Sequence, residues 1–256
     1  LGDSEEEARK QAETILAFET NLAIPRLDKV ARRDFRNFNN PRSMEEVQQM
    51  VPSIAWKDAF TSMGVTKKVD TIMVMQPAYM KVIENTMKKG DINTWKTVMR
   101  WATLNNAAGM LSTEIEKANW DFYSKTLRGA KKQKSAEERA LATVNNTVGE
   151  ALGKLYVDEM FPPEAKKKAE DMIANVIEAF KERIQKLDWM GDTTKVKAIQ
   201  KLDKFTVKIG YPDKWKDFST MDVKPENNYY QNMVAVAEWQ LKDNLDKINE
   251  PVDRTE

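Results

Sequence analysis

Adjacent glutamates are the first residues of this chain whose type and spacing suggest chemistry. Glu45-Glu46 and Glu137-Glu138 place two carboxylates side by side, and neighbouring carboxylates can act as general acid and general base. Each pair, however, ends a Ser-x-Glu-Glu sequence that directly precedes an apolar periodic run. That order is typical of a helix start, where the serine caps free amides and the acidic groups oppose the helix dipole. We therefore interpret both pairs as helix caps, and a hydrolase that uses only carboxylates is a remote alternative.

Two missing residue types exclude most other catalytic chemistry. The 256 residues contain no histidine and no cysteine, which removes the usual ligands of zinc and the base of a Ser–His–Asp triad. The acidic residues do not follow EF-hand spacing, and no glycine-rich loop matches a phosphate cradle. We therefore expect no catalytic, cofactor-binding or metal-binding residue within this chain.

Lysine clusters are candidates for binding an acidic partner. They occur at Lys166-Lys167-Lys168 and at residues 131–134, but the outer faces of helices are commonly this charged, so we interpret both clusters as solvated. The net charge of +1 gives no general attraction to nucleic acid or anionic membranes. No apolar run approaches the ~20 residues that span a bilayer. We expect no nucleic-acid partner and no membrane contact from this segment.

Two sets of large apolar side chains are candidates for a ligand surface. Trp95 and Trp101 are six positions apart on one predicted helix and cannot share a narrow stripe, so we expect one of them to be exposed to a cavity. Methionine side chains adapt to varied partners, and they recur at Met63, Met73, Met75, Met80 and Met87. For both sets the alternatives are core packing and a ligand or peptide surface, and core packing is favoured.

The composition predicts a helical protein. Glycine and proline number nine each, and charged residues make up 32% of the chain, above the ~25% of average proteins. Apolar periodicity and capping signals predict helices that span about 4–23, 43–51, 55–63, 77–89, 91–127, 135–156, 164–187, 192–204 and 228–248. Residues 26–42 are predicted to be a loop, and residues 69–76 and 205–209 are predicted to be extended. The predicted fold class is all-α: a multi-helix lobe with at most one or two short extended segments.

Several segments resemble the neprilysin and endothelin-converting-enzyme family of zinc metallopeptidases. The strongest is Val148-Gly149-Glu150-Ala151-Leu152-Gly153-Lys154-Leu155-Tyr156-Val157, followed by Phe161-Pro162-Pro163-Glu164-Ala165-Lys166. Others are Leu187-Asp188-Trp189-Met190, Ile209-Gly210-Tyr211-Pro212-Asp213-Lys214-Trp215 and Pro251-Val252-Asp253-Arg254-Thr255-Glu256. Weaker matches at Leu1-Gly2, Met44-Glu45-Glu46-Val47-Gln48 and Gln76-Pro77-Ala78-Tyr79 keep the family order. The resemblance covers essentially the whole chain.

The resemblance implies a place for the chain within a larger enzyme. In this family two largely helical lobes enclose a cavity; one carries the zinc site, and the other caps the cavity and restricts access to peptides. The chain is similar to the capping lobe. The family's Asn-Ala-Tyr and His-Glu-x-x-His motifs are expected beyond Glu256, so no catalytic or zinc residue is carried over. Zinc is implied as a cofactor of the parent protein only. The implied partners are the catalytic lobe and peptide substrates.

The sequence therefore predicts a non-catalytic helical lobe of a neprilysin-like zinc metalloendopeptidase. We expect an N-terminal helix and connector at 1–36, a substrate-gating lobe at 37–228, and a C-terminal helix leading to the catalytic domain at 229–256. The start at Leu1 and the abrupt stop at Glu256 are expected to be cut ends. The absence of cysteine favours a bacterial source, with an exported and a cytoplasmic location both open. The alternative function is a free-standing helical module that binds peptides or proteins without enzymatic activity.

Overall fold

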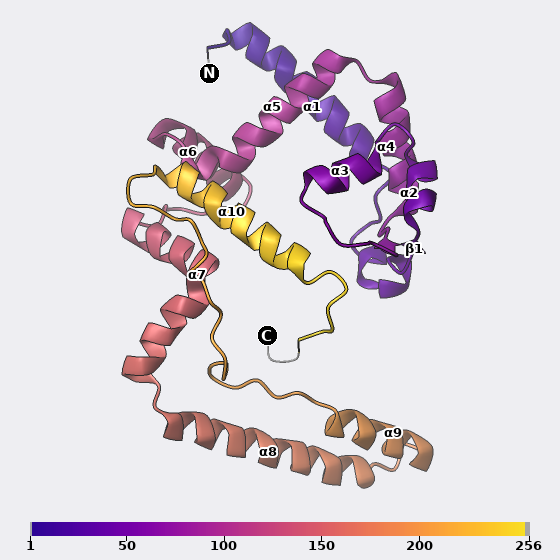
Figure 1. The fold of residues 1–256 in the computed structure, drawn as a ribbon, viewed down its shortest axis with the longest axis vertical. Helices are drawn as coiled ribbons and strands as arrows, with labels where there is room; N and C mark the ends of the chain where they lie inside the picture. Colours follow the sequence, from indigo (N-terminus) through magenta and orange to yellow (C-terminus); the bar gives the residue numbers. More distant parts are fainter. Residues whose placement is uncertain (1, 254–256) are drawn as a thin grey trace. The chain divides into compact units, whose positions relative to one another are not determined.

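Helices make up most of the chain in a computed structural model that describes residues 2–253. In chain order, the α-helices and strands of Figure 1 are α1 (Glu5–Ala23), β1 (Pro41–Arg42), α2 (Met44–Met50), α3 (Trp56–Ser62), β2 (Ile72–Met73), α4 (Pro77–Lys89), α5 (Ile92–Ala107), α6 (Thr113–Trp120), α7 (Ala136–Met160), α8 (Pro163–Gln185), α9 (Asp192–Asp203) and α10 (Tyr229–Asp246). Short 3₁₀ turns at Ala31–Arg33, Phe35–Asn37 and Ala108–Met110 and a π-helical turn at Asp121–Thr126 complete the helical structure. The predicted all-α class is confirmed.

The chain divides into two units that are interleaved in sequence. Unit 1 contains residues 2–133 and 222–250, and unit 2 contains residues 134–221 and 251–253. Unit 2 is therefore inserted into unit 1, and α10 belongs with the N-terminal helices.

The helix starts follow the predicted capping pattern. Ser43 and Ser135 each accept a hydrogen bond from the main-chain N–H of the glutamate three residues on, and each glutamate carboxylate accepts one from the serine N–H. At Ser4 only the first of these bonds forms, with the N–H of Glu7. A fourth start, at α10, uses the same reciprocal arrangement with Asn228 and Gln231, a pairing that sequence reasoning missed because it sought serine with glutamate.

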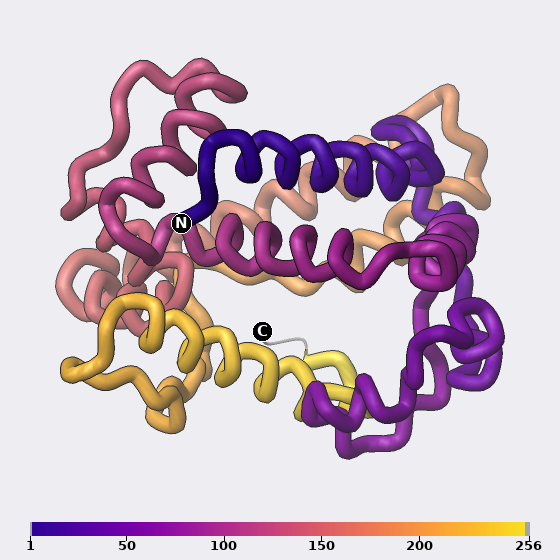
Figure 2. The backbone as a smooth tube through the Cα atoms, turned by 90° about the horizontal axis from the view of Figure 1, so that it is seen from above, coloured from indigo at the N-terminus to yellow at the C-terminus, as the bar shows by residue number. Residues whose placement is uncertain are grey.

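Unit 1 is held together by the pairing of α1 with α5 and by contacts between its N-terminal part and the segment that contains α10. α1 runs alongside α5 (Figure 2), and Phe18 meets Trp95 edge to face with ring centroids 4.8 Å apart. The C-terminal part of unit 1 is held by Lys67, whose ammonium donates to the carbonyl of Asp246 at 2.6 Å and to the Glu250 carboxylate at 2.7 Å. The core is small; its buried apolar side chains in the described residues are Val47, Val51, Val74, Val98, Ala107, Ala108 and Val236.

Unit 2 is built on α7, α8 and α9, with an aromatic anchor for the segment that follows α9. α8 packs along α9. Tyr211 stacks on Trp215 and meets Phe161 edge to face. The Lys166 ammonium lies 4.5 Å from the centre of the Tyr211 ring and donates to the Tyr211 carbonyl and the Asp213 carboxylate, both at 2.9 Å. These contacts fix the otherwise irregular segment against α8.

Three local predictions were wrong. The helix expected over 91–127 is interrupted at Ala108–Met110, where Gly109 weakens the helix and Leu111 adopts an extended backbone. Residues 205–209 do not form a strand, because alternation alone supplies no pairing partner. The loop expected over 26–42 contains strand β1, which pairs antiparallel with β2. α7 also has a kink that was not predicted, at Val148 (φ −127°, ψ 35°).

Candidate functional site

Of the carboxylates that first suggested chemistry, Glu46 and Glu138 cap helix starts. The Ser135 N–H and Oγ–H hold the pKa of Glu138 below its ordinary value, so this group stays ionised at the start of α7. No group of three or more residues that could hold a metal ion occurs within residues 2–253. The residues that this part of the chain provides therefore do not fit a zinc centre.

One buried acid was not predicted from the sequence. Glu84 on α4 is 6% exposed, and its carboxylate accepts hydrogen bonds from the Ser53 N–H at 3.1 Å and the Ser53 Oγ–H at 3.0 Å. The Lys88 ammonium lies 2.8 Å from the same carboxylate. The bond from Lys88 is the main cause that lowers the pKa of Glu84; burial opposes it and the Ser53 bonds add to it. Glu84 therefore joins α4 to the turn after α2 as a carboxylate and has no proton to donate.

The predicted methionine set converges on a groove of unit 1. We call this the methionine groove; it has a volume of about 240 Å³ and is lined by Val47, Trp56, Phe60, Ile72, Met73, Val74, Met75, Gln76, Tyr79 and Met80. Three of the five predicted methionines line it, and Met73 and Met75 are 51% and 56% exposed. Core packing, the favoured interpretation, is therefore wrong for these two.

The side chains of the groove are held in place by hydrogen bonds to its surroundings. The Trp56 indole N–H donates to the Val51 carbonyl at 3.1 Å, and the Gln76 side chain accepts from the Leu27 N–H at 2.9 Å. The Arg26 guanidinium donates to the Tyr79 hydroxyl at 2.8 Å and lies 4.6 Å from the centre of that ring. A cation is thus held against Tyr79, one of the lining residues, and the sequence could not reveal this contact because Arg26 and Tyr79 are 53 positions apart.

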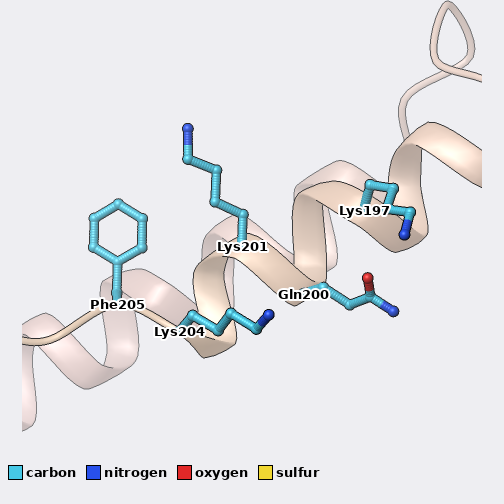
Figure 3. A pocket seen from close by; sticks show the side chains of 5 residues that line it. All are labelled: Lys197, Gln200, Lys201, Lys204 and Phe205. Atoms are coloured by element: carbon cyan, nitrogen blue, oxygen red, sulfur yellow. The ribbon is translucent and has the colours of Figure 1, made fainter. Parts of the chain in front are cut away.

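A second hollow lies beside α9 in unit 2. Its volume is about 580 Å³, and its lining consists of Lys197, Gln200, Lys201, Lys204 and Phe205. Figure 3 shows Lys201 and Phe205 projecting from the same side of the helix. Lys166 of α8 pairs with the Asp213 carboxylate. By contrast, none of the three lysines of the hollow pairs with a carboxylate of the described residues, so the positive charge there is not neutralised. The lining has a single apolar side chain, Phe205, so a ligand there would be held mainly by the lysine charges and the Gln200 amide.

The predicted aromatic strip is divided between core and surface. Trp95 packs on Phe18 as described, whereas Trp101 is 38% exposed. Trp101 is thus the more exposed of the two, but it lines neither of the two hollows described above, so the expected cavity at this tryptophan stays a prediction.

Apolar faces remain exposed on helices of both units. On α8, Met172, Val176 and Phe180 recur every four residues and are 60%, 44% and 54% exposed, so they form an exposed stripe. On α10, Val234 and Leu241 are 37% and 41% exposed. No helix within residues 2–253 has the length and apolar character needed to cross a membrane.

Comparison with known families gives one family match. The model of peptidase family M13 matches residues 1–212. Two curated relatives are each 30% identical: a neutral endopeptidase of Lactobacillus helveticus, over 99% of this chain and 39% of the relative, and neprilysin-3 of Drosophila melanogaster, over 100% of this chain and 34% of the relative. The chain thus spans little more than a third of their lengths.

Solved structures agree with this match. The Mycobacterium tuberculosis zinc metalloprotease Zmp1 in complex with an inhibitor is 32% identical and superposes with a TM-score of 0.89 over 100% of this chain and 38% of that one. In its open state the TM-score is 0.87, again over 100% of this chain, with 40% of Zmp1 covered. PepO of Lactobacillus rhamnosis, at 19% identity, has a TM-score of 0.90 over 100% of this chain and 40% of that one, and shows the fold alone.

Proposed function

The chain belongs to peptidase family M13, and from this premise we propose that it is the helical, non-catalytic lobe of a neprilysin-like zinc metalloendopeptidase. The observation that carries the proposal is the family match over residues 1–212 in a chain without histidine. Because the 256 residues contain no histidine, they cannot include a His-Glu-x-x-His motif. The zinc ion and the catalytic residues would therefore come from the remainder of the parent protein.

The proposed role is steric. Helices of the lobe wall a cavity, exclude folded proteins and admit peptides, which would be the substrates. The body of the lobe would be residues 37–228, and residues 1–36 and 229–256 would connect to or pack on the catalytic lobe. The exposed α8 stripe and the exposed Val234 and Leu241 of α10 support this role, because uncovered apolar faces of this kind mark interaction surfaces.

A peptidase assay tests the non-catalytic part of the proposal. The purified chain is incubated with fluorogenic peptides, with and without added zinc, and the full-length parent serves as the positive control. We expect cleavage by the parent alone. Zinc-dependent cleavage by the 256-residue chain would overturn the proposal.

The reading frame beyond Glu256 separates the proposal from the alternative of a free-standing binding module. Continuation into Asn-Ala-Tyr and His-Glu-x-x-His supports the lobe. A stop codon directly after Glu256 supports the module. Cleavage of peptides but not of a folded protein by the full-length parent then tests the gating role, and equal cleavage of both would contradict it.

A further inference from the structure

We propose that the methionine groove binds an extended peptide segment that pairs with the outer edge of β2, places an apolar side chain in the groove and carries a carboxylate that Arg26 recognises. This site would lie entirely on unit 1. The inference does not depend on the proposed function, because it concerns binding by the chain itself.

The edge of β2 away from β1 is paired with no strand of residues 2–253. In the ladder Arg42 lies opposite Ile72 and Pro41 opposite Met73, and the Val74 N–H donates to the Asn40 carbonyl at 3.0 Å. Bonded and non-bonded pairs alternate along an antiparallel ladder, so Met73, between two bonded positions, turns its N–H and C=O away from β1. Within residues 2–253 no third strand joins this sheet. An exposed strand edge is a ready template for an added strand.

The groove beside this edge suits side chains rather than a whole small molecule. Its volume of about 240 Å³ lies below the ~300–1,000 Å³ of typical small-molecule pockets. Val47 and Val74 are buried at its base, whereas Met73 and Met75 are more than half exposed. Flexible thioether side chains adjust to differently shaped apolar groups. The groove therefore favours apolar side chains without selecting one of them.

Arg26 supplies the charge that completes the site. Its guanidinium is fixed against Tyr79, which lines the groove, by a hydrogen bond of 2.8 Å and by its position over the ring. No carboxylate of the described residues pairs with it. Arginine binds carboxylates through planar, charge-assisted hydrogen bonds. An acidic side chain or a C-terminal carboxylate of the peptide is the complementary group.

Direct binding to the complete chain tests the site. The probe is a short fluorescein-labelled peptide of alternating valine and threonine with a free C-terminal carboxylate, and the readout is fluorescence anisotropy. Arg26→Gln should raise the Kd roughly tenfold, since one charge-assisted contact is lost, and Arg26→Lys should recover part of the loss. Met75→Glu should also weaken binding because it adds a like charge at the rim. Met172→Glu on α8, an equally exposed methionine, is the matched control and should leave the Kd unchanged.

Changes in the peptide test the backbone pairing without any risk to folding. N-methylation of alternate residues blocks every second N–H. One of the two methylation patterns should abolish binding and the other should leave it nearly intact, because only every second N–H of the bound peptide points toward β2. Amidation of the C-terminus should mimic Arg26→Gln.

Three results would overturn the proposal. The first is equal binding of the two methylated peptides, and the second is equal weakening by Met75→Glu and Met172→Glu. The third is concentration-dependent dimerisation of the chain that Met75→Glu abolishes while no peptide binds, which would assign the groove to a second copy of the chain.

Discussion

Glu84 shows how a single side chain can join two segments through its charge. Its carboxylate is ionised and bonded to Ser53 and Lys88, and its folded pKa lies below the ordinary value. A group with a lowered folded pKa stabilises the protein fully above its unfolded pKa and loses that contribution as the pH falls through the folded pKa. The stability of the wild-type chain should therefore fall in the acid range partly because Glu84 is protonated.

Glu84→Gln tests this dependence. The variant should be less stable than the wild type at neutral pH, and the difference should shrink as the pH falls below the ordinary glutamate pKa. Thermal unfolding followed by circular dichroism between neutral and acid pH measures both. Glu5→Gln removes an acid whose side chain is 92% exposed and should change little. A difference between Glu84→Gln and wild type that is constant over pH would contradict the explanation.

Gly210 is required by its backbone conformation and by a close neighbour. Its φ is +72°, and a Cβ there would lie 2.8 Å from Cε1 of Phe161. Gly210→Ala should therefore cost about 1–3 kcal/mol of unfolding free energy in unit 2, measured by urea denaturation. Gly191→Ala is the matched control, because Gly191 has φ −67° and no atom within 4 Å of the added Cβ. Equal effects of the two substitutions would show that the Phe161 contact is unimportant.

Among the elements, α7 depends on its capping box more than α1 depends on Ser4. The Ser135 Oγ accepts the Glu138 N–H at 3.1 Å, and the Ser135 N–H donates to the Glu138 carboxylate at 2.8 Å. The double substitution Ser135→Ala with Glu138→Ala removes both bonds and should lose about 1–2 kcal/mol of unfolding free energy. Ser4→Ala removes a single exposed bond and should lose less. Denaturant titrations of both variants give the comparison, and a larger loss for Ser4→Ala would contradict it.

The elements that the sequence predicted well are those with local signals. Serine caps placed the first turns of α2 and α7 correctly, and Pro77 and Gly90 placed the two ends of α4. The break after α5 was missed because Ala107, Met110, Leu111 and Ile115 keep the apolar period through the interruption. β1 has two residues and therefore no period to detect.

The candidate site was predicted only in part, because its composition was visible in the sequence but its long-range contacts were not. Methionine content indicated a possible peptide surface, and Met73, Met75 and Met80 do line the groove. The position of Arg26 over Tyr79 and the open edge of β2 depend on contacts between residues far apart in the sequence. Glu84 was missed because charged residues on amphipathic helices are ordinarily solvated, and the Ser53 turn that covers it leaves no local pattern.

At the scale of the whole molecule, we expect the exposed apolar stripe of α8 to promote self-association. Met172, Val176 and Phe180 are exposed at four-residue spacing on α8, and neighbouring exposed apolar side chains favour association of the isolated chain with itself. Phe180→Glu should reduce self-association in sedimentation velocity experiments and change unfolding free energy by no more than about 0.5 kcal/mol. A large loss of stability would show that Phe180 belongs to a folded core instead.

The insertion of unit 2 into unit 1 sets an order of events during synthesis on the ribosome. Lys67 reaches Asp246 and Glu250 across 179 and 183 positions of sequence, and these bonds join the two parts of unit 1. At translation rates of about 5–20 residues per second, the partners of Lys67 emerge many seconds after it. All of 134–221 is synthesised in between. The N-terminal helices of unit 1 therefore leave the ribosome before α10 is available to pack on them. The helices of unit 2 are complete earlier than α10 and can fold while unit 1 is still incomplete.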